Sequence, residues 1–168
     1  MTPQKAFDEY HQAVYSFAYR LTGQPEVAED ITQECFLVLV RDPKRYDPAK
    51  GTIKVYLFSI ARNLALKQYR DQRDEQPVED LEETLVIDPR GPLDVSAAVA
   101  TAVTSLPPLQ REALILFEYE GVTLEEIAQI VGTDIGTVKS RLHRATAALR
   151  AELEADEREA GYGQESMA

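Results

Sequence analysis

The chain has 168 residues and a formal net charge of −11. General binding to nucleic acid normally requires a basic protein, so this charge argues against it. Hydrophobic residues make up 44% of it, enough for one or two small globular domains. No apolar run approaches membrane-spanning length and the N-terminus lacks an apolar signal core, so we expect a cytoplasmic protein without membrane insertion. The single cysteine, Cys35, excludes an internal disulfide framework and a cysteine metal cage.

Positive charge is concentrated in two segments. Residues 41–73 hold nine Lys and Arg against three acids, and residues 135–150 hold four and no acid. We call these segments the first and second basic islands. They stand in an acidic background, and this pattern suits two separate nucleic-acid contacts with repulsion elsewhere.

Residues 3–73 read as almost continuous helix, interrupted at Gly23 to Pro25 and from Pro43 to Thr52. Within it, the helix from about residue 27 to 41 has one core-facing apolar arc that includes Cys35, which we expect to be a small core residue. Its other arc mixes polar groups with Phe36 and Leu37, which either are buried or dock a protein partner. The polar residues that fit a partner surface are Asp30, Gln33 and Glu34.

The first basic island combines cations with aromatic rings. A loop from Arg45 to Thr52 has a positive rim and one tyrosine, and the next helix alternates cations with aromatic residues and Asn63. Rings that stack bases beside cations that hold phosphates suit single-stranded nucleic acid. Tyr56 and Phe58 also fit an apolar stripe, so the pattern leaves base stacking and core packing equally open for them.

Residues 74–94 contain eight acids, three prolines and one glycine, as an exposed flexible linker does. Helical patterning returns at residues 93–105 and again from Pro107 to about Glu120. The acidic end, residues 154–168, is expected to be disordered. The fold class is therefore all-α, with helical domains at residues 1–73 and 95–153 joined by the acidic linker.

The C-terminal domain contains a helix-turn-helix pattern. Thr123 and Glu126 form a capping box, and Gly132 follows the end of that helix. The next helix places apolar residues on one face, at positions 135, 138, 142, 145 and 149. The opposite face and its flanks carry small polar and basic side chains, as a helix that reads the DNA major groove requires: Gly136, Thr137, Lys139, Ser140, Arg141, His143 and Arg144.

Several blocks of this sequence, in this order and spacing, resemble bacterial extracytoplasmic-function (ECF) sigma factors. They are AEDITQECF at 28–36, YLFSIARNL at 56–64, LPPLQRE at 106–112, EIA at 126–128 and GTVKSRLHRA at 136–145. The resemblance spans roughly residues 6–150. It implies a protein that binds core RNA polymerase at its clamp and flap and directs it to promoter DNA, as duplex and as melted non-template strand. It also implies an anti-sigma factor as a partner. The family commonly has Trp where this chain has Tyr56, so details of minus-ten specificity do not carry over.

The resemblance also implies roles for individual residues. Asp30, Gln33 and Glu34 would lie on the clamp-binding helix of region 2. Its minus-ten DNA surface would comprise Tyr46, Lys50, Lys54, Arg62, Asn63, Lys67 and Arg70. In region 4, the minus-thirty-five surface would comprise Arg111, Thr137, Lys139, Ser140, Arg141, His143 and Arg144.

The sequence gives little support for a metal site, a cofactor site or an enzyme active site. The two histidines, His11 and His143, are far apart, and no spacing suggests a metal site, a cofactor cradle or a catalytic constellation, so we expect neither an enzyme nor a cofactor. A conventional helix-turn-helix repressor or activator would explain residues 106–150 alone. A sigma-like module that binds polymerase without DNA would not need the cations of the second island.

Overall fold

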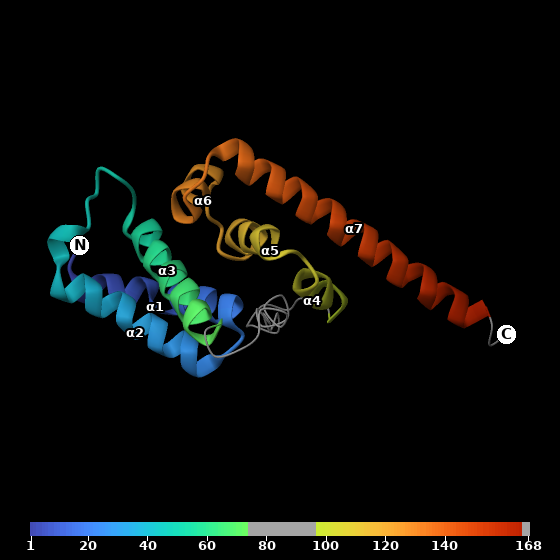
Figure 1. Cartoon of the computed structure of the whole chain (residues 1–168), viewed down its shortest axis with the longest axis horizontal. Coiled ribbons are helices and arrows are strands. Elements are labelled where there is room, and N and C mark those ends of the chain that lie inside the picture. The colour runs from blue at the N-terminus through green and yellow to red at the C-terminus, as the bar shows by residue number, and fades with distance from the viewer. Residues whose placement is uncertain (74–96, 166–168) are drawn as a thin grey trace.

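The computed structural model describes residues 1–73 and 97–165, and every regular element in these ranges is helical. Three helices form an N-terminal bundle, and a second group follows along the chain (Figure 1). In order they are α1 (Pro3–Thr22), α2 (Pro25–Arg41), the short η1 (Pro43–Arg45), α3 (Ile53–Arg73), α4 (Ala97–Thr104), α5 (Pro108–Leu114), the π-helical turn η3 (Ile115–Tyr119), α6 (Leu124–Val131) and α7 (Ile135–Glu165).

The N-terminal bundle, α1 to α3, closes around large apolar side chains. Phe17 of α1 and Phe58 of α3 are fully buried, with ring centroids 4.8 Å apart, and Cys35 of α2 is buried beside them in the same core. The turn between α1 and α2 uses Gly23 at φ 67°, a left-handed conformation that glycine adopts without a steric cost. Phe58 is thus a core residue, which decides one of the alternatives that its sequence pattern leaves open.

Local signals fix the helix-turn-helix. The Thr123 side chain accepts a hydrogen bond from the Glu126 backbone, and the Glu126 side chain accepts one from the Thr123 backbone, so the capping box is complete. Gly132 ends α6 at φ 71°. Asp134 then accepts hydrogen bonds from the backbone and hydroxyl of Thr137 at 2.8 and 3.1 Å, which lower the pKa of its carboxyl group and fix the first turn of α7.

The two groups of helices share one apolar core. Ile115 and Leu116 of η3 and Ile127 of α6 belong to the same buried cluster as Leu57 and Phe58 of α3. Helix α3 packs against α6, and α1 packs against η3. Burial of apolar surface at about 25 cal/mol per Å² favours this contact. The basic helix α3 therefore packs directly against the helix-turn-helix, through α6.

The all-α fold with two helical units is confirmed. The expected acidic linker, residues 74–94, lies outside the described residues. The expectation of a disordered tail at 154–168 was wrong for residues up to 165, because α7 continues through Glu165. Residues 151–160 are dominated by Ala, Glu and Leu, which are strong helix formers, and this propensity prevails over the acidic composition.

Removing the α6 cap should weaken the C-terminal domain. Thr123→Ala leaves a helix N-terminus without its side-chain acceptor, and we expect a loss of about 1 kcal/mol in the free energy of unfolding. Thr146→Ala is the matched control, since Thr146 is exposed within α7 and bonds only its own helix. Urea unfolding followed by circular dichroism measures both. Equal stability of the two variants would contradict a capping role.

Candidate nucleic-acid interface

The loop between η1 and α3 is held in a defined shape. The Tyr46 hydroxyl donates a hydrogen bond to the Gly51 carbonyl at 3.2 Å, and the Asp47 side chain accepts one from the Ala49 backbone at 3.0 Å. The Tyr46 ring lies 5.3 Å from the ring of Tyr56, centroid to centroid. Burial raises the pKa of the Tyr56 phenol, with Arg45 opposing the rise. An aromatic pair therefore stands at the base of a pre-shaped loop.

A cavity of about 250 Å³ opens at this loop. Its lining combines the two tyrosines with cations and backbone: Arg45, Tyr46, Asp47, Lys50, Gly51, Thr52, Val55, Tyr56, Ser59 and Gln129. Gln129 comes from α6, and its amide nitrogen donates a hydrogen bond to the Lys50 carbonyl. The sequence did not point to Gln129, because an exposed amide on an amphipathic helix has no distinctive pattern.

The polar residues expected to contact DNA along α3 fall into two groups. Asn63, Lys67 and Arg70 are exposed. Arg62 instead forms an ion pair with Glu112 of α5, and its second nitrogen lies 3.4 Å from the other carboxylate oxygen. Lys54 donates a hydrogen bond to the backbone carbonyl of Glu120, at 2.8 Å.

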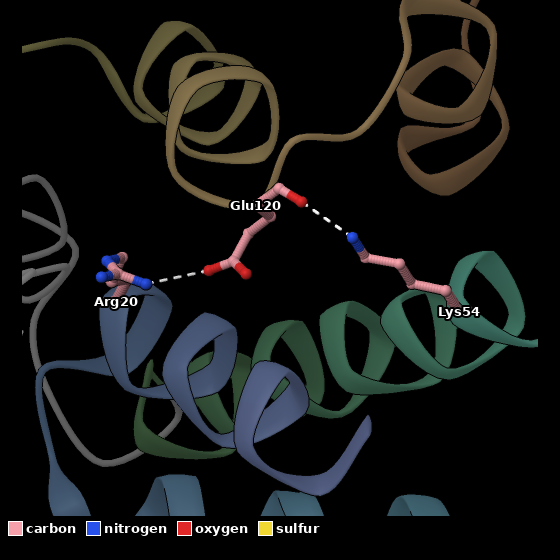
Figure 2. Close-up of polar contacts among 3 residues, drawn as sticks. All are labelled: Arg20, Lys54 and Glu120. Carbon is pink, nitrogen blue, oxygen red and sulfur yellow. Dashed lines mark hydrogen bonds and ion pairs between the residues drawn. The ribbon is translucent and has the colours of Figure 1, made fainter. Parts of the chain in front are cut away.

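Glu120 joins the two groups of helices through a buried ion pair. Its carboxylate lies 2.9 Å from the guanidinium of Arg20 of α1, and the two side chains are only 6% and 4% exposed. Arg20, Glu120 and Lys54 converge from three elements (Figure 2). The Arg20 guanidinium also lies over the Tyr119 ring, 4.7 Å from its centroid. Burial raises the pKa of Glu120, while Arg20 and then Lys54 act to lower it.

The expected major-groove face of α7 points outward. Val138 and Ala145 are fully buried and anchor the helix, whereas the reading face is accessible. Lys139, Ser140, His143 and Arg144 are exposed, and Thr137 and Arg141 are half-buried.

Arg111 is an exception among the expected DNA contacts. It is only 4% exposed, and its guanidinium donates a hydrogen bond to the Leu106 carbonyl at 2.8 Å. Burial lowers the pKa of this guanidinium. Packing of α5 thus turns Arg111 inward, where it bonds the preceding loop, so the phosphate contact expected of Arg111 stays a prediction.

The expected protein-docking face of α2 is partly apolar. Asp30 and Gln33 are exposed, and Glu34 lies 3.5 Å from exposed Arg41. Phe36 is 7% exposed and belongs to the core, whereas Leu37 is 42% exposed. Beside them runs a groove of about 570 Å³ lined by Pro3, Gln4, Phe7, Gln33, Phe36, Leu37 and Val40. The sequence did not point to Phe7, which lines this groove from α1, because a single exposed phenylalanine on an amphipathic helix has no distinctive pattern.

Cys35 behaves as a core residue. It is fully buried, its thiol lies 3.8 Å from the Leu57 carbonyl, and burial raises its pKa to about 12. Across residues 1–73 and 97–165, no group of three His, Cys, Asp or Glu could hold a metal ion. None of the helices described is long and apolar enough to cross a membrane.

Comparison with known proteins gives these surfaces a context. Residues 6–75 match Sigma-70 region 2, and residues 96–149 match Sigma-70, region 4. The chain is 37% identical over 154 residues to the ECF RNA polymerase sigma factor SigE of Mycolicibacterium smegmatis, covering 84% of this chain and 58% of that relative. It is 31% identical over 153 residues to SigL of Mycobacterium tuberculosis, covering 88% and 86%, and 36% identical over 146 residues to EcfG of Rhodopseudomonas palustris, covering 84% and 79%.

A solved structure agrees with these matches. The sigma factor RpoE of Bartonella quintana, in complex with the anti-sigma factor NepR, superposes with a TM-score of 0.73 at 29% identity, covering 91% of this chain and 97% of that one. CnrH in complex with the cytosolic domain of CnrY shares the fold, with a TM-score of 0.67 at 22% identity over 92% and 88% of the two chains. The bundle α1 to α3 is thus region 2, the helices α4 to α7 contain region 4, and the chain belongs to the ECF sigma factors of the sigma-70 family.

Proposed function

We propose that this chain binds core RNA polymerase in the cytoplasm and directs it to specific promoters. In this proposal region 2 opens the minus-ten element and region 4 reads the minus-thirty-five element. The observation that supports it is the presence on one chain of two different candidate surfaces: a loop pocket lined by aromatic residues and an exposed basic helix. The first suits an unstacked base and the second a duplex groove. The phosphodiester chemistry belongs to polymerase, and this chain contributes no catalytic group.

In region 2, the loop pocket would hold one base of the displaced non-template strand. Tyr46 and Tyr56 offer ring faces, and base stacking on such rings contributes about 1–3 kcal/mol per base. Among the described residues the buried Tyr56 hydroxyl has no hydrogen-bond partner, so it can bond to a base that enters. Lys50 stands at the pocket, and Asn63, Lys67 and Arg70 continue an exposed track along α3.

In region 4, α7 would enter the major groove with its first turns. Its buried stripe fixes the rotation of the helix, so that Ser140 and Arg144 face outward together. An arginine can bond a guanine edge with two nitrogens, which makes Arg144 the strongest candidate for direct base readout. Lys139, Arg141 and His143 flank it and would contact phosphates or neighbouring bases.

The partner surfaces follow from the remaining exposed groups. The polar residues Asp30, Gln33 and Glu34 border an apolar strip that ends in Leu37 and Val40. An apolar centre with a polar rim is the usual composition of a protein interface, and we assign this face to the polymerase clamp. The related RpoE was solved with an anti-sigma factor, and we extend a partner of that class to this chain.

Specific initiation tests the proposal as a whole. Core polymerase of the same organism should start transcription at a defined site only when this chain is added, because core enzyme alone lacks promoter recognition. Run-off transcription from a genomic fragment library, with start sites read by sequencing, measures this. A conventional repressor would bind DNA without core polymerase and would produce no new start sites.

The clamp face can be tested separately. Asp30→Ala combined with Gln33→Ala should weaken binding to core polymerase while the free energy of unfolding changes by no more than about 0.5 kcal/mol, as is usual for exposed positions. Glu157→Ala is the control, since it makes the same charge change on an exposed part of α7 beyond the region 4 match. Affinity is measured by fluorescence titration against core enzyme. Unchanged affinity, or a large loss of stability, would remove these residues from the interface.

The two DNA surfaces should fail at different steps. Arg144→Ala should cost about 1–3 kcal/mol in promoter recruitment and relax preference in the upstream element, as loss of a bidentate base contact does. It should spare a template already melted around the start site. Asn63→Ala should spare upstream recognition and impair strand opening. Permanganate footprinting on duplex and pre-melted templates distinguishes them, and loss of the same step in both variants would contradict the division of labour.

A further inference from the structure

A cavity of about 220 Å³ lies where α1, α3 and α5 meet, and we call it the α3–α5 cavity. Its lining residues differ from those of the loop pocket and of the groove beside α2. Most of its wall is apolar and comes from the last turn of α1, the second half of α3 and the first turn of α5: Leu21, Ala65, Leu66, Tyr69, Pro108 and Leu109.

The apolar wall of this cavity is incompletely covered by protein. Ala65 lines it with a single methyl group, and Ala65 and Leu66 are both half-buried. Leu109 is 50% exposed. Because removal of apolar surface from water is favourable, and concave apolar surfaces are the usual sites of small ligands, a molecule that fills the cavity gains from contact with these side chains.

One ion pair interrupts the apolar wall. Two nitrogens of the Arg62 guanidinium face the two carboxylate oxygens of Glu112, and the Glu112 side chain is only 9% exposed. A carboxylate oxygen can accept two hydrogen bonds, so Glu112 keeps acceptor capacity while Arg62 is bound. The cavity therefore offers a buried carboxylate to an N–H or O–H group.

The charged groups of the lining favour an uncharged ligand. Arg62 and Glu112 are the charged residues of the described lining, and they are paired with each other. An anionic ligand would be repelled by the Glu112 carboxylate, and a cation would compete with Arg62 for it. Transfer of an uncompensated charge into an apolar setting is costly.

Volume and lining define the shape of the ligand. A dry apolar cavity of about 150 Å³ can hold benzene, so the α3–α5 cavity suits two fused rings. The Tyr69 ring is part of the wall, and aromatic rings gain from offset or edge contact with one another. A rigid bicycle also loses less conformational entropy on binding than a flexible chain of the same size.

We propose that the α3–α5 cavity binds a small, uncharged, bicyclic aromatic molecule with one hydrogen-bond donor, such as indole. Its rings lie against Leu66, Tyr69 and Leu109, and its N–H donates to the Glu112 carboxylate. Since a ligand that binds the folded chain alone stabilises it by mass action, an occupied cavity raises resistance to unfolding. This inference is independent of the proposed function, and its test needs neither polymerase nor DNA.

Indole itself is the probe for the full-length chain. The chain contains no tryptophan, so excitation beyond the tyrosine absorption band reports on indole alone. Emission of indole should shift to shorter wavelength as it enters the apolar cavity, and a titration with the chain should saturate at a single indole per chain. The midpoint of urea unfolding should rise as indole is added.

Two analogues of indole test the chemistry of the ligand. Benzofuran has the same shape with an oxygen in place of the N–H, and it should bind about tenfold more weakly, as loss of a hydrogen bond to a charged acceptor does. Indole-5-carboxylate, an anion at neutral pH, should bind more weakly than indole. The rise in the urea midpoint compares the three compounds at equal concentration. Equal effects of indole and benzofuran, or a larger effect of the carboxylate, would overturn the proposal.

Two substitutions locate the site, each with a matched control. Ala65→Leu fills the cavity and should abolish the emission shift, whereas Ala147→Leu makes the same change at an exposed position of α7 and should not. Leu109→Ala removes one wall and should weaken binding about fivefold, as loss of part of an apolar contact does. Leu37→Ala truncates a similarly exposed leucine, 42% against 50%, in the groove beside α2 and should have no effect.

Circular dichroism establishes that each variant keeps its helices. Should Ala65→Leu lose helicity, Leu109→Ala decides the question, because half of the Leu109 side chain is already exposed. The proposal falls if indole shows no saturable binding or if binding survives Ala65→Leu in a folded chain. It also falls if Leu37→Ala weakens binding and Leu109→Ala does not, since indole would then occupy the other groove.

Discussion

The buried pair between Arg20 and Glu120 constrains how the two regions of this molecule face one another. Each group loses its hydration, so each needs the other in place. Because the partners sit 100 positions apart on different regions, satisfying them fixes how the regions face one another. The apolar core supplies most of the attraction, but apolar contact is non-directional. The charged pair is directional, and it fixes the orientation of one region relative to the other.

The π-helical turn η3 delivers Glu120 to this position. The Glu120 backbone bonds the Ile115 carbonyl and the Val122 backbone bonds the Leu116 carbonyl, so the chain leaves α5 with a wider last turn than an α-helix has. Such turns are rare and often occur at functional sites. Here the wider turn presents Tyr119 and Glu120 on the side of Arg20 while Ile115 and Leu116 enter the core.

Much of the secondary structure of this protein could be predicted from local sequence signals. Thr123, Glu126 and Gly132 mark the two ends of α6 in the sequence. The burial of Val138 and Ala145 agrees with the helical spacing of apolar residues in the sequence. The contacts between the two regions could not be predicted from the sequence. In the sequence Glu112 and Glu120 resemble ordinary solvated acids, and only the packing of α1 and α3 against them gives them partners. Arg111 shows the same limit in reverse: a cation at the start of a helix resembles a phosphate contact, and only the packing of α5 reveals that it points inward.

The continuation of α7 through Glu165 sets a boundary on how the helix can approach DNA. At about 1.5 Å per residue its 31 residues extend about 46 Å. The first half carries four cations and no acid, while residues 151–165 carry six acids and one arginine. DNA would therefore attract the first half of α7 and repel the second half. In the proposed complex α7 would enter the groove obliquely, with its first turns leading and Glu165 directed into solvent, because sliding the helix deeper along the groove would bring carboxylates against phosphates.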